Sequence, residues 1–138
     1  MGANSFNFAG DHAMPREIIA TDRIAPPVGP FSNAVRAGDL LFLSGQIALD
    51  PATSKLVAGD VGAQTERIFT NISAVLEAAG KSFDNVMKTT VYLADIKDFS
   101  AMNAVYARYF RAPYPARTTI QAAALPLGAA VEIEVVAR

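Results

Sequence analysis

Arg117 is the side chain best placed to bind a small organic anion. It opens a predicted strand in which Thr119 and Gln121 share its face, because strand side chains alternate between the two faces of a sheet. A guanidinium offers two parallel N–H donors that match a carboxylate. A salt bridge to Glu132 or Glu134 is the alternative role, so Arg117 is either an anchor for an acid or half of an ion pair.

Glu132 and Glu134 offer a second kind of chemistry. They share one face of the last predicted strand, at a separation of about 6–7 Å from the rise per residue of a strand. Paired carboxylates can divide acid and base roles between them. A Glu-x-Glu strand is also typical of a solvated or ion-paired edge, so both interpretations stay open at this point.

The segment Ser44-Gly45-Gln46 brings together a hydroxyl, a glycine N–H and a side-chain amide at the end of an apolar strand. These groups could converge on a ligand, although a turn alone explains the tripeptide nearly as well. Asn103 lies on a predicted helix, where it is ordinary polar surface if it has no ligand.

The composition excludes several classes of function. The 138 residues include no Cys, which removes thiolate nucleophiles, iron–sulfur clusters and cysteine-ligated zinc, and the one His, His12, precedes the predicted fold. A formal net charge of −1 disfavours dedicated binding of nucleic acid. No apolar run approaches the roughly 20 residues of a membrane span, and the first residues do not form a secretion signal. The expected compartment is therefore the cytoplasm, with no nucleic-acid or membrane partner.

Hydrophobic periodicity predicts two helices. From Asp60, a favourable N-cap residue, apolar residues follow helical spacing as far as Gly80, which suits a left-handed C-terminal cap. A second helix is expected after Asp98, with an apolar stripe from Phe99 to Phe110 that ends before two prolines.

Six segments rich in β-branched and aromatic residues, bounded by turn residues, are predicted strands. They cover residues 17–20, 31–37, 40–44, 86–93, 117–123 and 130–137. Segment 86–93 is expected to be a central strand with Met87, Thr89, Val91 and Leu93 on one face. The aromatic residues expected in the core are Tyr92, Tyr106, Tyr109 and Phe110.

This order of elements defines an α+β domain in which two helices cover one face of a single sheet. Several of the strands are mostly apolar, so the uncovered face would expose too much apolar surface in a monomer, and we expect a symmetric oligomer that buries it. The domain is expected over residues 17–138. Residues 1–16 are expected to form a flexible leader, either native or left by cloning.

Seven motifs together resemble the RidA/YjgF family of reactive-intermediate deaminases. In chain order they are Ala25-Pro-Pro-Val-Gly-Pro-Phe31-Ser-Asn, Leu43-Ser-Gly-Gln-Ile47, Val75-Leu-Glu-Ala-Ala-Gly80, Val86-Met-Lys-Thr-Thr-Val91-Tyr-Leu, Met102-Asn-Ala-Val-Tyr106, Pro115-Ala-Arg-Thr118 and Val131-Glu-Ile-Glu134. The resemblance implies a chorismate-mutase-like protomer, a homotrimer built around a barrel of three sheets, and clefts between neighbouring subunits. In the family these clefts hydrolyse enamines and imines, such as 2-aminoacrylate and 2-iminobutyrate, to 2-keto acids and ammonia without a metal or organic cofactor.

The resemblance also implies roles for individual residues. Arg117 resembles the family's carboxylate-binding arginine, and Glu132 resembles the glutamate that positions the attacking water. The remaining substrate-binding positions are Phe31, Ser44, Gly45, Asn103 and Thr119. Phe31 stands where well-characterised members have a tyrosine, and Thr119 stands where they have a cysteine whose backbone faces the substrate. Glu134 is assigned to structure or ion pairing.

Two other classes of function are weighed beside the deaminase. Family members have also been described as ribonucleases and translation inhibitors, against which the near-zero charge argues. A small-acid sensor or a chaperone-like module would use the same fold without turnover.

Overall fold

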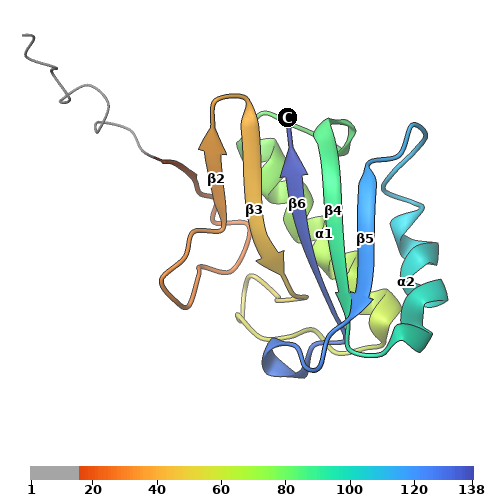
Figure 1. Ribbon diagram of the computed structural model, residues 1–138. Coiled ribbons are helices and arrows are strands. Elements are labelled where there is room, and N and C mark those ends of the chain that lie inside the picture. The colour runs from red at the N-terminus through yellow and green to blue at the C-terminus, as the bar shows by residue number, and fades with distance from the viewer. Residues whose placement is uncertain (1–15) are drawn as a thin grey trace, which may run out of the picture.

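Six strands of the computed structural model, which describes residues 16–138, form one mixed sheet in the order β1-β2-β3-β6-β4-β5 (Figure 1). The strands are β1 (Glu17–Ile19), β2 (Ala34–Ala37), β3 (Leu40–Gln46), β4 (Val86–Leu93), β5 (Ala116–Gln121) and β6 (Val131–Ala137). β4 and β5 are parallel, and the other neighbours are antiparallel. All of the expected leader except Arg16 lies outside the described residues.

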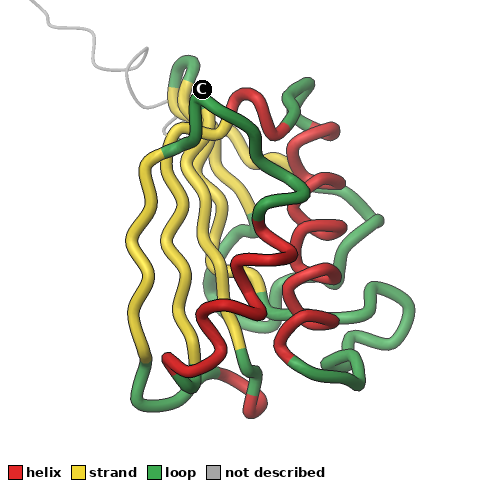
Figure 2. The backbone as a smooth tube through the Cα atoms, turned by 90° about the vertical axis from the view of Figure 1, so that its right-hand side faces the viewer, coloured by secondary structure: helices red, strands yellow, loops and turns green. Residues whose placement is uncertain are grey.

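Two helices, α1 (Val61–Ala78) and α2 (Phe99–Tyr106), cover one face of this sheet, as Figure 2 shows. The Asp60 side chain accepts a hydrogen bond from the Ala63 N–H at 3.0 Å and caps α1 as expected. Gly80 follows α1 with φ of +73°, a left-handed conformation that glycine adopts without strain. Three short 3₁₀ turns complete the fold: η1 (Phe83–Asn85), η2 (Ile96–Asp98) and η3 (Pro126–Gly128).

Alternation along β6 separates the core from the second face of the sheet. Val131, Ile133 and Val135 are buried beneath the helices, whereas Glu132 and Glu134 between them point to the other side. We call this second side the open face. Pairing across strands β3, β4, β5 and β6 assigns to it Phe42, Tyr92, Ile120, Glu132, Glu134 and Val136. The expected uncovered face therefore exists, and it combines apolar with acidic side chains.

The second helix is shorter than predicted. It ends at Tyr106, and turns replace the last expected turn of helix before Phe110, although Phe110 still packs into the core. Asp98 makes no side-chain capping bond, because η2 precedes α2 and Asp95 caps that 3₁₀ turn instead, accepting from the Lys97 N–H at 2.9 Å. The aromatic stripe predicted from helical spacing is thus partly carried by a turn.

Two residues of β4 lie elsewhere than predicted. Met87 is 48% exposed, because a register shift between Val86 and Lys88 gives the buried position to Val86. Tyr92 was expected in the core, but it lies on the open face because its neighbours Val91 and Leu93 point to the helices. Tyr106 and Phe110 are buried as expected, and Tyr109 is half-buried.

Candidate active site

Arg117 lies on the helix-covered side of the sheet, at the edge next to α2. It pairs with the buried Thr89 of β4, so its side chain rises toward the helix and away from the open face. A cavity of about 380 Å³ lies beside the guanidinium. The residues that line this cavity are Asn103, Tyr106, Ala107, Tyr114, Pro115 and Arg117.

One face of α2 holds the guanidinium. Nη1 of Arg117 donates a hydrogen bond to Oδ1 of Asn103 at 2.7 Å. Cζ of Arg117 lies 4.6 Å from the centroid of the Tyr106 ring and 5.4 Å from that of the Phe99 ring, which are cation–π distances. Because Asn103 is a neutral partner, the charge of Arg117 is left for an anion.

Tyr106 and Phe99 are supporting residues that the sequence argument did not assign to the site. The Tyr106 hydroxyl is hydrogen-bonded to Thr89 Oγ1 at 2.8 Å, and burial raises the pKa of this phenol. Phe99, Asn103 and Tyr106 are spaced i, i+4 and i+7, which places them on one face of a helix. That spacing was the signal that could have found them.

The alternative role of Arg117 as a partner of Glu132 or Glu134 is wrong for the protomer. Both glutamates project from the open face, whereas Arg117 projects from the helix-covered face. Among the ion pairs between residues 16 and 138, none includes any of the three side chains.

Glu132 lines a second cavity, of about 350 Å³, which shares no residue with the cavity beside Arg117. Phe31 and Gly45 line the same cavity, so three of the predicted site residues come together here. Burial raises the pKa of the Glu132 carboxyl, and the nearby charge of Glu134 raises it further. A carboxylate with this shift is a better proton acceptor than a solvated one.

Gly45 makes the closest approach to Glu132. A Cβ atom at position 45 would lie 2.8 Å from Oε1 of Glu132, closer than Cβ atoms come to other atoms, and 3.0 Å from Cδ. A β-bulge in β3 between Leu43 and Gln46 brings the glycine to this position. The absence of a side chain at Gly45 therefore leaves room for the carboxylate.

Ser44 and Thr119 have different surroundings from those of the cavity-lining residues. The Ser44 hydroxyl donates to the carbonyl oxygen of Ser32 at 2.6 Å and so fastens the loop that carries Phe31. Thr119 follows Arg117 on the same face of β5, and its buried hydroxyl has no hydrogen-bond partner among the described residues. Neither residue lines the two cavities described above.

Glu134 accepts a hydrogen bond from the Tyr92 hydroxyl on the open face. This bond, followed by burial, raises the pKa of the Tyr92 phenol. Of the two roles expected for Glu134, structure or ion pairing, the described residues show a hydrogen bond to a neutral phenol and no ion pair. The negative charge of Glu134 therefore stays near Glu132.

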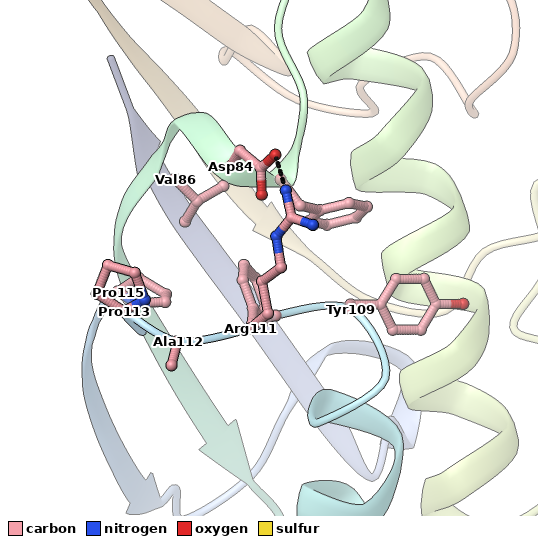
Figure 3. A pocket seen from close by; sticks show the side chains of 9 residues that line it. Asp84, Val86, Tyr109, Arg111, Ala112, Pro113 and Pro115 are labelled. Carbon is pink, nitrogen blue, oxygen red and sulfur yellow. Dashed lines mark hydrogen bonds and ion pairs between the residues drawn. The ribbon is translucent and has the colours of Figure 1, made fainter.

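A further cavity of about 370 Å³ lies between η1 and the segment that joins α2 to β5 (Figure 3). It is lined by Tyr109, the segment 110–113 and the exposed ion pair of Arg111 with Asp84, whose atoms are 2.8 Å apart. No predicted site residue lines it.

Between residues 16 and 138, no group of three or more His, Cys, Asp or Glu is placed to hold a metal ion. In the same part of the chain, every helix is too short or too polar to cross a bilayer.

Comparison with known proteins identifies the family. The model of the Endoribonuclease L-PSP family matches residues 22–138, and the chain belongs to this family, which is the RidA/YjgF family. The 2-iminobutanoate/2-iminopropanoate deaminase of Capra hircus is 47% identical over 125 residues, which cover 91% of each chain.

Solved structures agree with this assignment. RidA from an Antarctic Psychrobacter species has a TM-score of 0.85 at 44% identity, with 88% of this chain and 98% of that chain covered. TdcF of E. coli with bound serine has a TM-score of 0.83 at 38% identity, with 88% and 97% covered. The sequence-based prediction of family and protomer fold is confirmed.

Proposed function

We propose that this protein hydrolyses 2-imino acids, and the enamines that tautomerise to them, to 2-keto acids and ammonia. The observation that carries the proposal is the Arg117 guanidinium, which α2 holds beside a cavity through a neutral amide and two aromatic rings. A guanidinium held in this way suits a substrate carboxylate. The deaminase name of a relative that is 47% identical supports the same reaction.

The complete site would be formed by two copies of the chain. Arg117 and Glu132 project from opposite faces of the sheet, so one protomer cannot hold a small substrate between them. The open face carries exposed apolar side chains, among them Phe42 at 43% and Ile120 at 45% exposure, which a second subunit would cover. A homotrimer with clefts between neighbouring subunits accommodates both features.

The chemistry requires one water molecule and one base. Arg117 binds the carboxylate of the substrate, which places the C=N carbon near the neighbouring subunit's copy of Glu132. Glu132 accepts a proton from water as the oxygen attacks that carbon, and it passes this proton to the imine nitrogen, which becomes an amine. Collapse of the carbinolamine expels ammonia and leaves the ketone, so no electrons are exchanged with a cofactor.

The other predicted residues are assigned supporting roles. Asn103 orients Arg117, Gly45 leaves room for the Glu132 carboxylate, and Phe31 forms a wall of the Glu132 cavity. We assign Ser44 to fixing the loop of Phe31, and Thr119 to the substrate through its backbone.

An assay on freshly generated 2-aminoacrylate and 2-iminobutyrate tests the proposal. Arg117→Ala is expected to lower kcat/KM by roughly 30-fold or more, since losing the anchor of a carboxylate costs about 2–5 kcal/mol. Arg117→Lys is expected to fail as well, because an ammonium does not reproduce the planar fork. Arg111→Ala is the matched control, because Arg111 is exposed and pairs with Asp84 away from both cavities.

Three results would contradict the proposal. Wild-type turnover by a folded Arg117→Ala variant would show that the anchor is misassigned. Binding of small acids without turnover would indicate a sensor. Cleavage of RNA by the purified wild-type protein, lost together with Arg117, would indicate the ribonuclease activity for which the family model is named.

A further inference from the structure

The cavity that contains Glu132 has an apolar wall contributed by three separate segments. The Pro26-Pro27-Val28 segment and Phe31 form one part, Ile47 and Leu49 form a second, and Leu127 of η3 forms a third. Val28 is 86% exposed, Leu127 is 70% exposed and Phe31 is 48% exposed, so their side chains lie at the mouth of the cavity and not in the core.

The side-chain amide N–H groups of this cavity already donate hydrogen bonds within the protein. The amide nitrogens of Asn33, Gln46 and Asn71 donate to the carbonyl oxygens of Ala25, Ser44 and Leu49 at 3.2, 3.2 and 2.9 Å. Glu132 is the one ionisable side chain among the lining residues. An anionic group would therefore meet a carboxylate here without a cation, whereas an apolar group would meet an apolar wall.

Leu127 is held in an unusual backbone conformation. Its φ of 58° and ψ of 18° lie in the left-handed region, which costs a leucine energy that glycine or asparagine avoids. This conformation accompanies a large apolar side chain that is exposed beside Glu132 and contributes nothing to the core. Backbone strain that benefits no core packing is typical of a functional position.

From these observations we propose that the Phe31, Val28 and Leu127 wall binds the side chain of the substrate, and that the preferred substrates are 2-imino acids with large branched or aromatic side chains. This inference rests on the proposed deaminase function. An apolar cavity of about 150 Å³ already holds a benzene ring. The cavity of about 350 Å³ is therefore larger than a methyl or ethyl side chain needs.

The test compares imines made in situ by an amino-acid oxidase from alanine, leucine, phenylalanine and glutamate. Each rate constant is divided by that of spontaneous hydrolysis, so that differences in intrinsic reactivity cancel. Burial of one additional methylene contributes roughly a factor of four. We expect the leucine-derived and phenylalanine-derived imines to exceed the alanine-derived imine by on the order of tenfold or more, and the glutamate-derived imine to be the poorest.

Variants locate the preference in the structure. Leu127→Asn removes the apolar side chain and keeps a residue that tolerates the left-handed backbone. The ratio of the normalised rate constant for the leucine-derived imine to that for the alanine-derived imine is therefore expected to fall toward one. Ile96→Asn is the control, because Ile96 is a 45% exposed apolar residue of η2 outside both cavities, and its ratio is expected to remain that of the wild type.

The possible failures differ from one another. Acceleration of the alanine-derived imine without any dependence on side-chain size refutes the side-chain subsite and leaves the deaminase function intact. Absence of acceleration for every imine refutes the function and the subsite together. A Leu127→Asn variant that changes the oligomer mass in light scattering would assign Leu127 to a subunit contact and also overturn the subsite.

Discussion

Gly45→Ala tests the placement of Glu132 by adding one carbon atom. The new Cβ would lie 2.8, 3.0 and 3.2 Å from Oε1, Cδ and Cγ of Glu132, whereas ordinary contacts begin at 3.4 Å. The carboxylate must therefore retreat by about 0.5 Å or change its rotamer. No positive φ is recorded at Gly45, so the backbone itself accepts alanine.

We expect this substitution to reduce activity far more than stability. Displacement of a catalytic group by about 1 Å can lower a rate by about 100-fold, so a fall in kcat/KM of roughly 10- to 100-fold is expected. The displaced atoms are the end of a flexible side chain that faces a cavity, so the free energy of unfolding is expected to change by less than about 1 kcal/mol.

Imine hydrolysis and urea unfolding are measured on the same preparations, with Gly62→Ala in α1 as the matched control. A Cβ at position 62 would lie 3.3 Å from Asp60 and touches no residue of either cavity. A double-mutant cycle gives the decisive measurement. If Gly45 acts through Glu132, adding Gly45→Ala to Glu132→Gln causes little further loss. Additive losses, or wild-type activity of Gly45→Ala, would refute the reasoning.

The remaining predictions concern the charges near Glu132, the orientation of Arg117 and the assembly. Glu132→Gln should lower kcat by roughly 10²- to 10⁴-fold. Activity that depends on the ionised Glu132 is lost as pH falls through its raised pKa. Glu134→Gln removes one cause of the raised pKa, so the acid limb of the pH–activity profile should move to lower pH. An unchanged acid limb would show that the charge of Glu134 does not act on Glu132. Asn103→Ala should raise KM about 2- to 12-fold, as expected for a hydrogen bond of about 0.5–1.5 kcal/mol, and an unaltered KM would show that α2 does not orient Arg117. Light scattering should give three times the 14.6 kDa of one chain, and a monomer mass at micromolar concentration would exclude the shared site.

Local patterns were sufficient to predict most of the fold. The capping residue Asp60 and the left-handed Gly80 bound α1, and β4 matches its predicted range of 86–93 because β-branched residues and flanking polar turns agree there. The errors arise where tertiary contacts override local preference. The register shift at Met87 is imposed by pairing with β6, and no propensity of the β4 segment encodes it.

Sequence reasoning proposed candidate site residues but could not give their arrangement. Alternation shows that Glu132 and Glu134 share a face, and this holds in the structure. It does not say to which face Arg117 points relative to them, because that depends on how β5 and β6 each pair with β4. The Tyr106 ring contacts Arg117 because α2 packs against the edge of the sheet, and no spacing of residues within β5 predicts that packing.

Within one protomer, the sheet separates Arg117 from Glu132 and so prevents the two side chains from forming an ion pair. An arginine and a glutamate that can reach one another form an ion pair, and the substrate carboxylate would then compete with a side chain for the guanidinium. Arg117 instead has a neutral hydrogen-bond partner, and Glu132 has a second carboxylate as its charged neighbour. Each group therefore keeps its charge available for the substrate that we propose to bind between two subunits. On this reasoning, a protomer that cannot assemble should retain the fold of both half-sites and lose turnover completely.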